Sequence, residues 1–499
     1  MREDVYPSGP VVHRCCADTL CRRRLFLAGG DVVSVPSRKD RGGYGVVVQV
    51  ESGQSDSTPD GAGERVLLRP GPTEPSVYQG ATTIDDYAVL SWSTEYGTIG
   101  LAYSLFSSIT LARRFAASLY TRYGDDMNKR YSSVVVARND WGLDAPELEA
   151  VDLYDGARHS DPYTPTWEQL ATLLGTEAPW WHSTLRDRAA ILGWSPGSPP
   201  AIVPACDPDL PTEALTSLAV DEPDGSPAAA VCLWLAQRIR RQSAESAGVD
   251  LKLIEKQRDG DCCDLVLGAV PAPINRPAPD PLPEVVRRAG WMQIVERRDT
   301  LAAAVAELIE KWDGGRDWPM GSQAELDPVA CPVAAEWTTY LLETNAEQPP
   351  TVLERSLLDR VSEVDTGVLL HDPVTGLPAV RCTDHLGETH VFAAVPQRLN
   401  TTASLTEVTL SDGNVWIRTA DRHLWLAPQC PGRGLNWGYH GEGPSTLTTL
   451  IDRLLDDITA PSVDSYDQAP EGLLRLIMNT PQAKSTTYTR ARLEQARNG

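Results

Sequence analysis

The sequence predicts a multidomain α+β protein, in which small, mainly antiparallel sheets are each followed by packing helices. Three observations support this prediction. A chain of 499 residues exceeds what one hydrophobic core usually serves, since a domain typically holds roughly 100–200 residues. Hydrophobic residues make up 41% and charged residues 23%, as in ordinary folded proteins. Groups of short valine-rich segments precede segments of helical periodicity, which is the order of an α+β fold.

Three domains are expected. Residues 1–165 form an N-terminal α+β domain with a basic N-terminal arm, and residues 166–330 form a middle domain that begins with helices and continues as hairpin, strand and helix. Residues 331–499 form a C-terminal α+β domain. Proline-rich linkers are expected near 195–227 and 271–283, because proline-rich backbone is extended and stiff.

In the first domain, segments rich in valine and bounded by Gly, Pro, Ser and Asp predict strands. One helix is expected over about 103–123, where apolar residues recur at helical spacing. The predicted strands are 31–35, 45–50, 65–68, 87–92 and 133–137.

The middle domain begins with a capping box, because Thr166 and Gln169 can each accept a hydrogen bond from the other's backbone amide at a helix start. An Asp-Gly pair within QRDGD predicts the tip of a hairpin. A later helix is expected to be capped by Asp299 or Thr300. The other elements predicted here are helices over about 178–193 and 228–242 and strands over 250–255, 263–267 and 291–296.

The last domain is predicted to begin with helices over about 332–344 and 350–362. A β-rich stretch follows, in which turns such as SDGN separate short strands. These strands are 367–370, 379–382, 390–394, 407–410, 415–418 and 424–426.

The segment RGLNWGYHGEGPSTLTTLIDRLLDDI, residues 433–458, combines a glycine-dense turn with an amphipathic helix. Pro444 suits the first helical position and Gly443 the N-cap, while Gly438 and Gly441 permit positive φ in the approach. The same geometry could bind a phosphate or carboxylate through free backbone amides. That ligand site would include Trp437, Gly438, Tyr439, His440, Gly441, Gly443 and Ser445.

We favour the structural interpretation of this turn. The segment lacks the Lys-Ser/Thr pair of a phosphate loop and the spacing of a dinucleotide fingerprint, and Glu442 would repel an anion. The stretch NWGYHGEGP, residues 436–444, resembles the W-G-Y-x-G-x-G-P element of uncharacterised actinobacterial and phage- or plasmid-associated proteins. The resemblance implies an actinobacterial source and a mobile-element setting, and it implies no activity.

Two other clusters raise the question of a metal. His13, Cys15, Cys16 and Cys21 lie close together, but their spacing does not give the two separated arms of a structural zinc site. Weaker candidates for a metal or for acid–base chemistry surround a predicted hairpin tip, where a solvated turn explains the same composition. They are Asp384, His385, Glu388 and His390. We therefore expect neither a metal nor a cofactor.

The net charge of −23 gives a negative field that repels nucleic acid and anionic membranes at long range. Residues 1–45 are mildly basic, so any contact with nucleic acid is expected there. No apolar run reaches the roughly 20 residues that span a bilayer, and a cytoplasmic location is expected. The favoured function is non-catalytic binding of a macromolecule, with a protein as partner. The alternatives are an enzyme or nucleotide-binding protein that uses turn 438–445, and nucleic-acid contact through the N-terminal arm.

Overall fold

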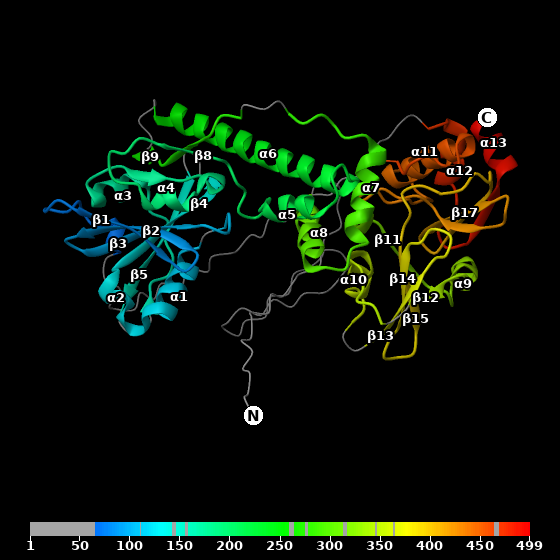
Figure 1. Cartoon of the computed structure of the whole chain (residues 1–499), viewed down its shortest axis with the longest axis horizontal. Helices are drawn as coiled ribbons and strands as arrows, with labels where there is room; N and C mark the ends of the chain where they lie inside the picture. Colours follow the sequence, from blue (N-terminus) through cyan, green and yellow to red (C-terminus); the bar gives the residue numbers. More distant parts are fainter. Residues whose placement is uncertain are drawn as a thin grey trace. The chain divides into compact units, whose positions relative to one another are not determined.

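The computed structural model describes residues 65–499, except 110, 142–145, 155–157, 259–263, 275–277, 313–316, 345–346, 363–364 and 464–468. The described residues all belong to one compact unit, Glu64–Gly499. Within it, helices alternate with several small, mostly antiparallel sheets, so the multidomain α+β prediction is confirmed (Figure 1). The predicted strands 31–35 and 45–50 lie outside the described residues.

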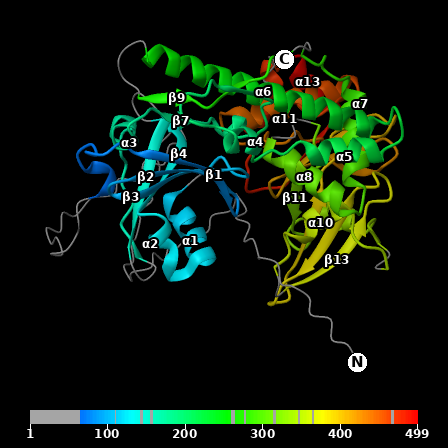
Figure 2. The ribbon, with the colours of Figure 1, turned by 60° about the vertical axis from the view of Figure 1, so that its left-hand side comes forward.

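The first sheet has six strands in sequence order, and only the β3–β4 pair is parallel. Helix α1 (Ala112–Tyr123) makes the crossover from β3 to β4 and buries Phe115 and Leu119 against one face. Helix α3 (Trp167–Leu174) lies on the other face (Figures 1 and 2). The strands are β1 (Val77–Ile84), β2 (Tyr87–Thr94), β3 (Gly97–Ser104), β4 (Ser133–Trp141), β5 (Pro146–Tyr154) and β6 (Arg158–His159).

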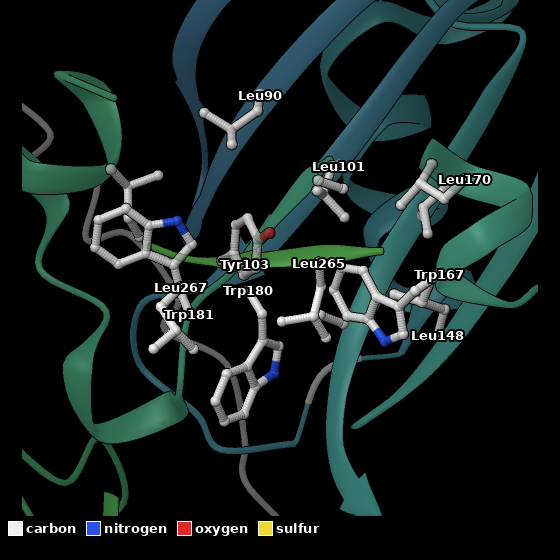
Figure 3. Close-up of a cluster of buried hydrophobic side chains, with 14 of the residues drawn as sticks. Leu90, Leu101, Tyr103, Leu148, Trp167, Leu170, Trp180, Trp181, Leu265 and Leu267 are labelled. Carbon is white, nitrogen blue, oxygen red and sulfur yellow. The ribbon is translucent and has the colours of Figure 1, made fainter. Parts of the chain in front are cut away.

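The face under α3 carries the largest aromatic cluster. Trp167, Trp180 and Trp181 pack there with leucines from the sheet and from β9 (Leu265–Leu267), as Figure 3 shows. Each buried side chain of this size contributes on the order of 2–3 kcal/mol. Two short parallel pairs border this core: β7 (Ala178–Trp180) with β9, and β8 (Ala201–Val203) with β10 (Ala269–Pro271). Between β7 and β8 lie η3 (Ser183–Leu185) and α4 (Arg188–Leu192).

A helical layer follows in the chain. The helix α6 (Pro227–Arg258) packs against α7 (Glu284–Val295) where Gly290 meets Pro227. Buried residues of these helices share a second core with Trp318 and Leu357. The other members of the layer are α5 (Glu213–Asp221) and α8 (Thr300–Trp312), and Asp299 caps α8 by accepting a hydrogen bond from the Ala302 amide at 2.9 Å.

Two antiparallel sheets complete the described chain. One has the order β11-β15-β14-β13-β12 and the other β18-β17-β16-β19. The first consists of β11 (Gln323–Leu326), β12 (Leu342–Glu343), β13 (Thr366–His371), β14 (Pro378–Thr383) and β15 (Thr389–Ala394), with η4 (Pro319–Gly321), α9 (Pro332–Thr338) and α10 (Val352–Leu358). The second consists of β16 (Leu405–Ser411), β17 (Asn414–Thr419), β18 (Leu424–Leu426) and β19 (Thr486–Thr489), with α11 (Glu442–Asp456), α12 (Glu471–Met478) and α13 (Arg490–Arg497).

Several predicted elements are confirmed. The strand at 87–92 and that at 133–137 form, and so do all six predicted strands between 367 and 426. The capping box at Thr166 and Gln169 has both of its hydrogen bonds. The two boundaries between the three predicted domains stay predictions.

Several predicted elements are wrong in whole or in part. Residues 66–68 form a 3₁₀ turn, the helix predicted over 103–123 begins only at 112, and 178–180 form a strand. Residues 250–255 continue α6, because Ala247, Leu251 and Ile254 are buried at helical spacing. Residues 291–295 belong to α7 for the same reason, with Trp291, Ile294 and Val295 buried. The expected linker 195–227 holds β8 and α5.

Candidate functional site

The glycine turn ahead of α11 packs closely against the segment that follows α12. The Gly438 amide donates a hydrogen bond to the Ile477 carbonyl at 3.2 Å, and Gln482 Nε2 donates to the Trp437 carbonyl at 2.6 Å. Gly438 has φ +79°, and a Cβ there would lie 2.7 Å from the Thr480 carbonyl oxygen. Glycine is therefore required at this position by both conformation and space.

The start of α11 differs from the prediction in one detail. The N-cap is Gly441 rather than Gly443, and Pro444 is the third helical residue rather than the first. A proline is still tolerated there, because the first four amides of a helix have no intrahelical acceptor. Ser445 Oγ donates to the Gly441 carbonyl at 3.0 Å, so this hydroxyl is used within the helix start.

The aromatic and imidazole groups of the turn do not meet around one hollow. Trp437 is buried in the core that α11 covers, whereas His440 is exposed. Tyr439 lies over the two following glycines: a Cβ at Gly441 or at Gly443 would lie 2.6 or 2.7 Å from atoms of its side chain. The structure thus brings Tyr439, Gly441 and Gly443 together as a packed turn.

The second candidate cluster forms the loop of the β14–β15 hairpin. Asp384 Oδ1 accepts hydrogen bonds from the amides of Leu386 and Glu388, each at 2.8 Å. His385 Nδ1 lies 3.8 Å from Asp365 Oδ1, and His390 is paired with Cys382 in the ladder. No group of three or more His, Cys, Asp or Glu side chains within the described ranges could hold a metal ion. The cluster of His13, Cys15, Cys16 and Cys21 lies outside those ranges, as does the arm 1–45.

The sequence did not indicate the loop that follows β3, residues 105–109. Arg186 is buried and donates hydrogen bonds to the carbonyls of Ser104 and Ser107, at 3.2 and 3.5 Å. The Ser108 amide lies 3.3 Å from both carboxylate oxygens of Asp209. Two large apolar side chains project from this anchored loop: Phe106 is 67% exposed and Ile109 is 64% exposed. The signal that was overlooked is the Ser-Ser pair between them, which interrupts the helical pattern assigned to 103–123.

The buried His182 joins two segments, the η3 turn and helix α6. His182 Nε2 lies 3.0 Å from Asp250 Oδ2, and His182 Nδ1 accepts a hydrogen bond from the Thr184 amide at 3.2 Å. Burial lowers the pKa of His182, and Asp250 opposes this shift. The neutral ring therefore donates from Nε2 and accepts at Nδ1, which caps η3 and ties it to α6.

A polar cavity of about 250 Å³ lies beside this histidine and is lined by Thr184, Asp207, Ser243 and Lys311. Burial raises the pKa of Asp207. His182 Nδ1 lies 2.8 Å from the Thr184 hydroxyl and 3.2 Å from the Thr184 amide, so both groups lie within hydrogen-bond distance of this nitrogen.

These features define a multidomain α+β protein in which the two predicted sites within the described residues, 437–445 and 384–390, lie at a packed turn and a hairpin loop. No protein-family model, no curated protein and no solved structure matches the chain. None of the helices in the described residues combines the length and the apolar character needed to cross a membrane.

Proposed function

We propose that this chain binds another protein without catalysis of its own, and that the loop 105–109 is the contact. The observation that supports the proposal is the pair Phe106 and Ile109, two large apolar side chains held in solvent by a loop with fixed anchors. A folded protein exposes such side chains singly without consequence, but two neighbours on one loop form a surface that a partner can bury.

The anchors matter because binding costs conformational entropy. A loop already fixed by Arg186 and Asp209 loses little freedom when a partner docks, so more of the burial energy contributes to affinity. Aromatic side chains at the centre of an interface often carry most of its binding energy. The exposed carboxylate of Asp209 beside them favours a partner with an apolar pocket and a basic rim.

The proposal includes a cytoplasmic setting in an actinobacterial host or its mobile elements. Cys206, Cys232, Cys331 and Cys382 carry free thiols, which are usual in a reducing compartment. The acidic composition, with a net charge of −23, supports a protein rather than a nucleic acid as partner.

The test compares the double variant Phe106→Ser/Ile109→Ser with a matched control, Leu386→Ser. Leu386 is 73% exposed at the tip of the β14–β15 hairpin, so the control removes a similar apolar side chain elsewhere. Each protein is used as bait in a quantitative pull-down from the native host, and a photoreactive side chain is placed at 106 to cross-link the partner. The double variant is expected to capture the partner at least about thirtyfold more weakly than the wild type, because it removes the centre of the interface. The control Leu386→Ser is expected to capture the partner as the wild type does.

Three results speak against the proposal. One is the recovery of no specific partner over several growth states, and another is equal capture by the double variant and the wild type. The third is binding that depends steeply on salt and is lost when residues 1–45 are deleted, which would assign the contact to nucleic acid.

A further inference from the structure

A second cavity, of about 370 Å³, lies along helix α7 and does not involve the loop 105–109. Val285, Arg288, Ala289 and Met292 line it, at the spacing of one helical stripe. The opposite side of α7 buries Trp291 and Ile294 in the second core, so this stripe faces the cavity instead of the protein interior.

The far wall is formed by the segment that follows β15 and by the β13–β14 turn. Apolar side chains dominate both walls, and those that matter for a ligand are Ala289, Met292, Pro319, Leu377, Val395 and Pro396. Cavities of roughly 300–1,000 Å³ with apolar walls and a few polar groups are typical of sites for small molecules. With about 370 Å³, this one accommodates a compact ligand rather than a folded segment of a partner.

Two cationic side chains line the cavity, and they differ in their contacts. Arg398 is neutralised, because its guanidinium forms a two-pronged ion pair with Glu284 and donates to the Thr459 carbonyl at 2.8 Å. The neighbouring Arg287 is also paired, with Asp317 at 2.6 Å. By contrast, the guanidinium of Arg288 makes no hydrogen bond or ion pair with any residue that the structure describes. Of the two cations, Arg288 is therefore the one without a carboxylate partner among the described residues.

Gln397 also lines the cavity, and its side-chain nitrogen lies beneath the lining surface. The Nε2 atom of Gln397 is buried and has no hydrogen-bond acceptor among the described residues. Leaving a buried amide donor unpaired costs about 1–3 kcal/mol, and such groups usually have a partner in a protein. An oxygen of a bound ligand would satisfy it.

We propose that this cavity binds a small organic carboxylate with an aliphatic or aromatic body. The guanidinium of Arg288 matches the two oxygens of a carboxylate, Gln397 supplies a further donor, and the apolar walls cover the hydrocarbon part. The inference is independent of the proposed protein contact, since the two sites share no residue.

Isothermal titration calorimetry on the full chain tests this with octanoate and hydrocinnamate as probes. Octanamide provides the neutral counterpart, and inorganic phosphate provides charge without an apolar body. The wild type binds the two carboxylates more tightly than either control compound. Arg288→Gln weakens carboxylate binding at least about tenfold, because it removes a charge-assisted hydrogen bond. Arg188→Gln makes the same change of charge at an exposed position of α4 and leaves the affinity unchanged.

Two further variants separate ligand binding from folding. Ala289→Phe fills the cavity and abolishes binding of both probes. Gln397→Met removes the unpaired donor, so it raises the thermal stability of the ligand-free protein while it weakens binding. The proposal is overturned if the wild type binds neither carboxylate at millimolar concentration, if Arg288→Gln binds them like Arg188→Gln, or if phosphate binds as tightly as octanoate.

Discussion

The imidazole of His182 is held 3.0 Å from the carboxylate of Asp250, which lies 68 residues further along the chain on α6. His182 is buried, and its other ring nitrogen accepts from the Thr184 amide. The pair therefore fastens the segment between β7 and α4 to the middle of a long helix. This cross-link depends on the protonation state of one ring, which makes it sensitive to pH.

Lowering the pH below about 6.5 is expected to destabilise the folded chain through His182. Burial lowers the pKa of this imidazole below the ordinary value of about 6.5, so the unfolded chain binds the proton more readily than the folded one. The contribution is thus fully present above pH 6.5 and is lost as the pH falls towards the folded-state pKa. Denaturant unfolding at several pH values between 7.5 and 5 measures the slope.

The matched pair of variants is His182→Gln and His440→Gln. His440 is exposed in the turn before α11, so its replacement should leave the pH dependence of stability as in the wild type, while His182→Gln flattens it.

Asp207 acts in the opposite direction and at lower pH. Burial raises its pKa above about 3.9, so its stabilising contribution is lost as the pH rises through that raised value. An unchanged slope in His182→Gln would assign the pH dependence to other groups.

Removal of the Arg297 side chain should lower the free energy of unfolding by about 1–3 kcal/mol. This lies between the loss expected for breaking an exposed ion pair and that for breaking a buried one. Its guanidinium contacts Asp221 at 2.6 Å, Glu222 at 2.5 Å and Asp299 at 2.7 Å, and so joins the end of α5 to the start of α8. Glu222 is mostly buried and would be left without this partner.

Chemical denaturation of Arg297→Met against Arg475→Met measures this difference. Arg475 pairs with Glu471 on an exposed face of α12, where ion pairs contribute less than about 1 kcal/mol. Equal effects of the two substitutions would show that the three-carboxylate cluster adds nothing beyond a surface pair.

Two helical glycines should respond in opposite ways to alanine. In α7, a Cβ at Gly290 would lie 2.5 Å from the Pro227 carbonyl oxygen and 2.7 Å from Val231 Cγ2, so Gly290→Ala forces α6 and α7 apart and costs about 1–3 kcal/mol. In α6, a Cβ at Gly248 would meet nothing within 4 Å, so Gly248→Ala should stabilise by up to about 1 kcal/mol through helix propensity. Thermal unfolding of both variants checks the sign, and destabilisation of both would contradict the helix packing described here.

The parts of the fold that depend on nearby residues could be predicted from the sequence. The capping box at Thr166 and the cap at Asp299 each need only residues three positions away, and both form. The six strands between 367 and 426 are bounded by turn residues that act locally. Residues 250–255 are a short apolar run, which fits a strand as well as a helix. They are helical because Leu251 is buried against a core that distant segments build, and the local sequence does not show this contact.

The candidate sites were less predictable for the same reason. The glycine turn was recognised, because Gly438 does adopt the positive φ that the sequence permits. The cavity along α7 joins Arg288 to Gln397, and the anchored loop joins Ser108 to Asp209. Neither pair is marked by a motif or by a fixed spacing, so only the folded chain brings these groups together.

Substitution of Gly438 provides the most direct test of the turn before α11. Gly438→Ala should lower the free energy of unfolding by about 1–3 kcal/mol, because φ is +79° and the new Cβ would lie 2.7 Å from the Thr480 carbonyl. Gly434→Ala is the control, since a Cβ there meets nothing within 4 Å. Thermal shift with nucleotides and phosphorylated metabolites is measured on the same proteins. If the turn is structural, Gly438→Ala loses the same stability with and without these compounds. If a compound stabilises the wild type and Gly443→Asp abolishes this effect, the turn is an anion site instead.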